Sequence, residues 1–208
     1  MTTISTNDRS RKQLRRELRR ERRAFEGAER RDAERAIFCN LQHMRAYQRA
    51  RKIAVYVGID GEVDLSAISA HARSSNKSIF APVLAQNGLR FVETGTRRGF
   101  RRNRFGIPEP GGGRRIDPRE LDVVLTPLVA FDNRGYRLGM GKGYYDRCFG
   151  FLRRRTRWRK PKLIGIGFDF QKIEKLVPRY WDVPLWGAVT NTGIDYFGGT
   201  TTDELLAS

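Results

Sequence analysis

Histidine and cysteine are scarce in this chain of 208 residues, which contains two of each. His43 and His71 are far apart in the sequence and belong to no cluster, which disfavours a zinc centre or a histidine-based catalytic triad. Cys39 and Cys148 form neither a C-x-x-C pair nor the disulfide framework of a secreted protein. A reducing, cytoplasmic location is therefore expected.

Long apolar runs are also missing. No segment approaches the roughly 20 residues that a membrane span requires, and the Arg-rich N-terminus lacks the apolar segment of a signal peptide. Association with a membrane is therefore not expected. The length is suited to a single domain over residues 1–208 with a substantial core, in which residues 1–8 and 195–208 are expected to be flexible tails.

Acidic residues are outnumbered by basic ones, 23 to 41, which gives a formal net charge of +18. Three segments, residues 1–52, 97–104 and 153–162, hold 28 of the 41 cations. Such segments are typical of solvated faces and loops, but a basic nucleic-acid-binding protein is an alternative. That alternative is disfavoured, because no DNA- or RNA-binding motif accompanies the charge and charge alone gives only non-specific, salt-sensitive affinity.

Apolar and polar patterning predicts alternating strands and helices. Apolar, β-branched runs predict strands at residues 52–58, 78–84, 89–93, 122–125 and 163–168. Apolar residues near helical spacing predict helices at residues 9–25, 29–48 and 65–73. Strands that alternate with helices favour an α/β fold with an open sheet and layers on both faces.

The stretch after the strand at 122–125 has the composition of a phosphate site. Its segment RLGMGKGYYD (137–146) has glycines at alternate positions, so backbone N–H groups can approach a bound anion closely. Arg137 and Lys142 add two cations, and a helix expected at residues 144–152 would point its N-terminus at the same anion.

Two familiar phosphate motifs are excluded by the spacing of this segment. A Walker A loop has four residues between its glycines and a Ser or Thr after the lysine, whereas Lys142 is followed by Gly143. The dinucleotide fingerprint G-x-G-x-x-G is replaced here by G-x-G-x-G. A flexible solvated loop is the alternative interpretation.

The same stretch closely resembles the signature of the 5-formyltetrahydrofolate cyclo-ligases, also called methenyltetrahydrofolate synthetases, which is approximately P-x-x-x-F-D-x-x-G-x-R-L-G-x-G-x-G-Y-Y-D. The matching residues are Pro127, Phe131, Asp132, Gly135, Arg137, Leu138, Gly139, Gly141, Gly143, Tyr144, Tyr145 and Asp146. The resemblance implies a three-layer Rossmann-like fold. It also implies an ATP-dependent ligase that converts 5-formyltetrahydrofolate to 5,10-methenyltetrahydrofolate through a phosphorylated formyl (iminophosphate) intermediate, with release of ADP and phosphate.

The resemblance also implies where ATP and Mg²⁺ bind. The ATP-binding residues would be Arg11, Arg15, Arg137, Leu138, Gly139, Met140, Gly141, Lys142, Gly143, Tyr144 and Tyr145. Lys142 and Arg137 would be the catalytic cations, and Asp146 and Asp182 would hold Mg²⁺ through their carboxylates. Arg11 stands where the family usually has lysine. The family's later acidic residue is replaced by Trp186, so the metal role is not extended beyond Asp182.

The folate, carrying one or several glutamates, would contact three positions, one of which is shared with ATP. Glu62 lies in an E-V-D element where the family's glutamate accepts paired N–H donors from the pterin. Phe105 and Tyr144 would complete the substrate site, Phe105 as a flat apolar surface. The alternatives are a turn carboxylate for Glu62, a core residue for Phe105, and an ATP-using enzyme of the same fold that acts on another substrate.

Overall fold

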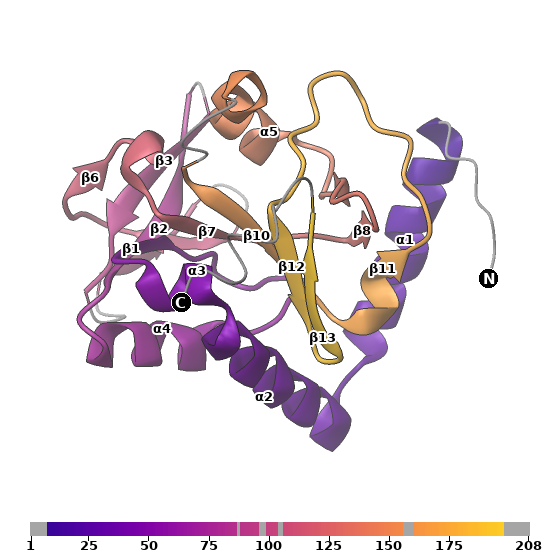
Figure 1. The fold of residues 1–208 in the computed structure, drawn as a ribbon, viewed down its shortest axis with the longest axis horizontal. Helices are drawn as coiled ribbons and strands as arrows, with labels where there is room; N and C mark the ends of the chain where they lie inside the picture. The colour runs from indigo at the N-terminus through magenta and orange to yellow at the C-terminus, as the bar shows by residue number, and fades with distance from the viewer. Residues whose placement is uncertain (1–7, 87, 96–98, 104–105, 156–159, 198–208) are drawn as a thin grey trace.

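The computed structural model describes residues 8–86, 88–95, 99–103, 106–155 and 160–197. Its frame is an eight-stranded sheet in the order β13-β12-β10-β7-β1-β2-β3-β6 (Figure 1). The strands are β1 (Lys52–Ala54), β2 (Ser78–Ala85), β3 (Gly88–Glu93), β6 (Arg115–Ile116), β7 (Val123–Pro127), β10 (Lys162–Ile166), β12 (Gly187–Thr190) and β13 (Gly193–Tyr196). The five strands from β12 to β2 are parallel, whereas the pairs β12–β13, β2–β3 and β3–β6 are antiparallel. The expected α/β class is confirmed.

The apolar run of β7 forms the centre of the sheet. Val123 pairs with Ile53 of β1 on one side and with Lys162 of β10 on the other. Residues 123–126 are buried, as expected for a parallel strand that is covered on both faces. Because parallel strands end at the same edge, the segments that follow β1 and β7 meet there, and in open α/β sheets this edge is where ligands bind.

Helices cover the two faces of the sheet unequally. One face carries α2 (Gly27–His43), α3 (Arg45–Arg49) and α4 (Ser66–Ser74), and the other carries α5 (Tyr144–Phe149) with the 3-10 helix η2 (Gly150–Arg154), as Figure 1 shows. Two further 3-10 turns are η1 (Pro118–Glu120) and η3 (Asp169–Gln171). Ile37, Leu41 and Ile68 fill the first core, and Phe149 packs with Phe91 in the second.

The first helix, α1 (Asp8–Ala24), lies at one end of the molecule beside a small sheet (Figure 1). That sheet has the order β11-β8-β9, with β8 (Ala130–Asp132), β9 (Arg137–Leu138) and β11 (Lys172–Ile173). Leu14 and Leu18 are buried in one cluster with Leu138, which directly precedes the alternating glycines. The amphipathic pattern of α1 therefore anchors it against the glycine segment.

Several boundaries differ from the expectation. The tail expected at 195–208 is wrong for residues 195–197, because Asp195 and Tyr196 end β13 and the Phe197 side chain is buried, and residues 198–208 lie outside the described ranges. Phe100–Arg102, expected in a loop, is strand β4 and pairs with β5 (Pro108–Pro110). The helix expected at 29–48 is divided at Met44, which has an extended backbone. Within the described ranges, no helix has the length and apolar character needed to cross a membrane.

Candidate active site

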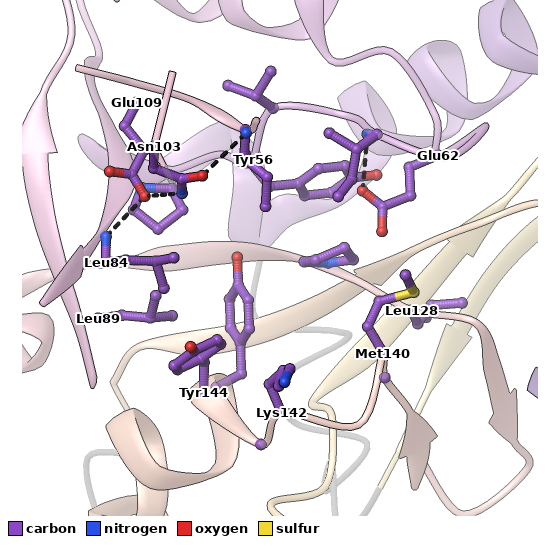
Figure 2. Close-up of a pocket in the computed structure, with 18 of the residues that line it drawn as sticks. Tyr56, Glu62, Leu84, Leu89, Asn103, Glu109, Leu128, Met140, Lys142 and Tyr144 are labelled. Atoms are coloured by element: carbon purple, nitrogen blue, oxygen red, sulfur yellow. Dashed lines mark hydrogen bonds between the residues drawn. The ribbon is translucent and has the colours of Figure 1, made fainter. Parts of the chain in front are cut away.

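A cavity of about 360 Å³ lies at the carboxyl edge of the parallel strands. Its size falls in the usual range for small-molecule sites, roughly 300–1,000 Å³. Figure 2 shows Tyr56 and Glu62 on one side and Lys142 and Tyr144 opposite them. The cavity is thus formed where the segment after β1 faces the segment after β7.

The alternating glycines form a tight turn at one wall of this cavity. Gly141 has a φ of +99° and Gly143 a φ of +61°, in the left-handed region that strains other residues. Arg147 braces the turn, since its Nη1 donates to the Lys142 carbonyl at 2.8 Å and its guanidinium lies 5.2 Å from the centre of the Tyr144 ring. The turn therefore presents Lys142 on a fixed backbone.

The helix that follows this turn is shorter than expected. It was predicted to span 144–152, but α5 ends at Phe149 and the chain continues as a 3-10 helix. With six residues, α5 has little dipole to offer an anion, because a macrodipole is the sum of many aligned peptide units. Attraction of an anion at this wall therefore depends on the backbone N–H groups and the cations.

Arg137 and Asp146 form an ion pair behind the turn. Arg137 Nη2 donates to Asp146 Oδ1 at 2.9 Å, and Arg137 Nη1 donates to the Val183 carbonyl at 2.6 Å. Val183 N donates back to Asp146 Oδ1 at 3.1 Å. These bonds join β9, α5 and the segment before β12, and both charged residues line the cavity.

The two arginines predicted from α1 are not among the residues that line the cavity, and one of them contacts the turn. Arg15 Nε donates to the Gly139 carbonyl at 2.8 Å. Arg11 is buried, and its Nη2 lies 3.3 Å from Asp182 Oδ2. Arg11 Nε is buried and finds no hydrogen-bond partner among the described residues.

Glu62 is a buried carboxylate in the opposite wall, with 8% of its surface exposed. Its Oε2 accepts a hydrogen bond from Ile59 N at 3.2 Å, and its Oε1 lies 3.9 Å from Arg22 Nη1. Burial raises the pKa of Glu62 to about 7, and the nearby Arg22 charge opposes that rise. Tyr56 lines the same cavity, and within the described part of the chain its buried hydroxyl has no hydrogen-bond partner.

Asp60 fixes the loop that carries Glu62. Its carboxylate accepts hydrogen bonds from Arg19 at 2.6 Å, from Arg22 at 3.1 Å and from Arg23 at 2.8 Å. Burial alone would raise the pKa of Asp60, but the bonds from Arg19 and Arg23 hold it at about 2. Asp60 has a φ of +54°, so this cluster also stabilises a strained backbone.

Residues 7–191 match the model of a family described as the 5-formyltetrahydrofolate cyclo-ligase family. The chain belongs to this family. A 5-formyltetrahydrofolate cyclo-ligase from Haemophilus influenzae is 33% identical over 187 residues, which cover 86% of this chain and 97% of that protein. One from Escherichia coli K12 is 36% identical over 152 residues, covering 68% of this chain and 78% of that protein. The NMR structure of an Aquifex aeolicus 5,10-methenyltetrahydrofolate synthetase has a TM-score of 0.78 at 31% identity, covering 92% of this chain and 95% of that one.

Most of the residues expected from the cyclo-ligase signature do meet at one place. The cavity is lined by Glu62, Arg137, Gly139, Met140, Lys142, Gly143, Tyr144, Tyr145 and Asp146. Leu138 differs, because its side chain is buried in the cluster with Leu14 and Leu18 and faces away from the cavity. Asp182 is held by Arg11 and is not among the residues that line the cavity. Phe105 lies outside the described residues.

The hairpin β4–β5 closes a third side of the cavity, through residues that the sequence did not single out (Figure 2). Asn103 Nδ2 donates to Glu109 Oε1 at 2.6 Å, and Leu84 N of β2 donates to the same oxygen at 2.9 Å. These bonds fasten the hairpin to the sheet. Glu109 is four residues from Phe105, which the sequence analysis did name, whereas Tyr56 looked like one more residue of an apolar strand.

Proposed function

We propose that this protein is an ATP-dependent cyclo-ligase that converts 5-formyltetrahydrofolate to 5,10-methenyltetrahydrofolate and releases ADP and phosphate. The observation that carries the proposal is the shared cavity. A buried carboxylate suited to a pterin, Glu62, faces the glycine turn that presents Lys142. Each wall suits one of the two substrates, and the cavity would bring their reacting groups together.

The reaction would begin when the formyl oxygen attacks the γ-phosphorus of ATP and the bond to ADP breaks. N10 of the folate then attacks the formyl carbon of the resulting iminophosphate and loses its proton. The five-membered ring closes, and phosphate leaves with the original formyl oxygen and takes up that proton. Charge on the transferring phosphoryl group must be neutralised. Lys142 and Arg137 would supply positive charge, and backbone N–H groups of residues 139–143 would cradle the phosphates.

The arginines of α1 would hold the remaining phosphates of ATP. Arg11 is buried, and its Nε, which has no hydrogen-bond partner among the described residues, is a donor suited to an incoming anionic oxygen. Arg15 already contacts the glycine turn through Gly139. A polyphosphate bound at the turn would extend from Arg15 toward Arg11.

Asp146 and Asp182 would hold Mg²⁺ together with the phosphates of a bound nucleotide. Mg²⁺ in such sites is held by one or two carboxylates together with substrate phosphates and water. The described residues contain no group of three or more His, Cys, Asp or Glu side chains that could hold a metal ion, so a cage built from protein ligands does not fit. When bound, Mg²⁺ would neutralise phosphate charge during transfer.

The folate would occupy the side of the cavity opposite Lys142. The ionised Glu62 carboxylate would accept the paired N–H donors of the pterin. The Tyr56 hydroxyl, which is otherwise unpartnered within the described ranges, would bond to a polar atom of the same ring. Tyr144 lines the cavity beside Lys142 and would contact both substrates, and Phe105 is proposed as an aromatic contact.

The proposal is tested by mixing the full chain with Mg-ATP and 5-formyltetrahydrofolate and recording the absorbance of the methenyl product. We expect product only when both substrates are present, with one ADP formed for each methenyl-folate. ATP hydrolysis that proceeds without the folate would favour an enzyme of the same fold with another substrate. Tight binding of nucleic acid without any turnover would favour the basic binding protein.

A further inference from the structure

An aromatic pair is displayed to solvent on the connection between β11 and β12. Among the described residues, the large apolar side chains that are substantially exposed are Met140, Val177, Tyr180, Trp181 and Tyr196. Three of these five lie within residues 177–181, and Tyr180 is 85% exposed. The rings of Tyr180 and Trp181 meet edge to face with centroids 4.5 Å apart. A cluster of this kind is typical of a surface that binds something.

The backbone beneath the pair is firmly held. Tyr180 and Trp181 are the two central residues of a turn in which Asp182 N donates to the Arg179 carbonyl at 2.9 Å. The Asp182 carboxylate closes the same turn by accepting a hydrogen bond from Arg179 N at 2.9 Å. The Arg153 side chain donates a further hydrogen bond to the Tyr180 carbonyl. The two rings are therefore presented on a braced turn, which lowers the entropy cost of binding.

The turn is attached directly to the proposed phosphate site. Asp182 pairs with Arg11 of α1, and the next residue, Val183, bonds to both Arg137 and Asp146. Figure 1 shows the connection between β11 and β12 running between α1 and α5. Trp181 directly precedes Asp182, so the Cα atoms of these two residues are about 3.8 Å apart. A ligand bound through phosphates at Arg11 would reach these rings with its other end.

We propose that Tyr180 and Trp181 form the platform on which the adenine base of ATP stacks. This inference rests on the proposed function, because it assumes that the phosphates of ATP bind at the glycine turn and at Arg11. An aromatic side chain offers a flat face on which a purine can stack. Arg179 lies 5.1 Å from the centre of the Trp181 ring and adds a cation beside the aromatic pair. The occupant is therefore a nucleotide with an anionic end and a flat aromatic end.

Stacking of this kind acts on binding more than on chemistry. The base is remote from the γ-phosphate, so its contacts are equal in the bound substrate and in the transition state. Loss of the platform should raise KM for ATP while leaving kcat unchanged. Because every base has a π-face, the platform should also tolerate other purine nucleotides.

The test compares four variants of the full chain: Tyr180→Ala, the double variant Tyr180→Ala/Trp181→Ala, the conservative Trp181→Phe, and the control Val177→Ala. For each variant, kcat and the KM values for ATP and for the folate substrate are measured. Inhibition by inorganic tripolyphosphate, which has the phosphates but no base, is measured alongside. We expect the double variant to raise KM for ATP roughly 10- to 100-fold, the range that stacking on one base provides. Tripolyphosphate inhibition, kcat and KM for the folate should be unchanged, and Trp181→Phe and Val177→Ala should resemble the wild type.

An unchanged KM for ATP in the double variant would overturn the inference. The inference would also be overturned if inhibition by tripolyphosphate weakened as much as the use of ATP. That result would mean that the double variant had only lost the contact between the turn and Arg11. The double variant could instead lose binding to a single-stranded oligonucleotide while its KM for ATP stays unchanged. That result would also overturn the inference and would make nucleic acid the ligand of the aromatic pair.

Calorimetric titration with ATP alone separates this inference from the proposed function. If the wild type binds ATP and the double variant binds it weakly, the platform is supported even where no methenyl-folate is formed. If the wild type turns over and both proteins bind ATP equally, the platform fails while the proposed function stands.

Discussion

Arg22 Nη1 lies 3.9 Å from Glu62 Oε1, and both side chains are buried. The same guanidinium donates to the Leu128 carbonyl at 2.9 Å and, through Nε, to the Asp60 carbonyl at 3.0 Å. One residue of α1 therefore joins the loop after β1 to the loop after β7. These two loops form opposite walls of the cavity, so Arg22 fixes their separation as well as the charge near Glu62.

Arg22→Leu is expected to destabilise the protein by about 3–5 kcal/mol, the usual cost of removing one member of a buried ionic cluster. The change removes hydrogen-bond donors from Asp60 and removes the guanidinium that donates to the Leu128 carbonyl. Thermal unfolding measures the effect, with Arg20→Leu as the matched control. Arg20 is exposed on the same helix, so its replacement should change the free energy of unfolding by no more than about 0.5 kcal/mol. Equal unfolding temperatures for the two variants would contradict the structural role of Arg22.

The pH dependence of folate use is expected to follow Glu62, whose pKa is raised by burial to about 7. The ionised form accepts two N–H donors, so kcat/KM for the folate substrate should rise as the pH increases through about 7. The effect on stability has the opposite sign, because a pKa above the ordinary 4.5 means that stability is lost as the pH rises from about 4.5 to 7.

Glu62→Gln tests this assignment, since the amide has no proton to lose in this range. The variant should lower kcat/KM and abolish the rise near pH 7, which a profile of kcat/KM against pH reports for the free enzyme. Glu174→Gln, an exposed change outside the cavity, is the control and should keep the wild-type profile. A rise that persists in Glu62→Gln would assign the titration to another group.

The glycine turn could be predicted from sequence because its determinants are contiguous. Gly141 and Gly143 do adopt the left-handed backbone for which glycine is suited. Arg137 and Asp146 were predicted separately, as a cation and a metal ligand, and the structure joins them in one ion pair. Local sequence thus identified the residues of the turn, but it did not reveal which of them are partners.

Other features depend on contacts between distant residues and could not be predicted. Arg22 belongs to a helix rich in arginine and looked like part of a solvated face, yet its partner Leu128 is 106 positions away. Phe197 lay in an expected tail. It is buried because Gly135 has no side chain, and a Cβ there would come within 2.8 Å of the Phe197 ring. The burial of Arg22 and of Phe197 therefore depends on backbone that is distant in the sequence, and the periodicity of apolar residues does not predict such contacts.

Lys142→Ala is expected to lower kcat by about 100- to 1,000-fold, equivalent to about 2.7–4 kcal/mol, by analogy with the loss of one preorganised donor to a transition state. The side chain is exposed on the turn, so the unfolding temperature should stay close to that of the wild type. Turnover under saturating ATP and folate gives the measurement, and Lys175→Ala, an exposed lysine beyond β11, is the control. Wild-type turnover in a folded Lys142→Ala protein would remove this lysine from the catalytic group.

Asp146→Asn and Asp182→Asn are each expected to raise the Mg²⁺ concentration needed for half-maximal activity by about tenfold or more, the least that changes around a metal site usually cost. An amide keeps an oxygen ligand but loses the charge that a hard cation prefers.

Both carboxylates also pair with an arginine, so loss of the ion pair must be separated from loss of metal binding. Asp195→Asn serves as the control, because it breaks only a surface pair with Lys172, whose contribution to stability is about 0–1 kcal/mol. Structural damage would lower the unfolding temperature and kcat without moving the Mg²⁺ midpoint. A midpoint that shifts for Asp146→Asn but not for Asp182→Asn would leave Asp182 as the partner of Arg11 and the residue that closes the aromatic turn.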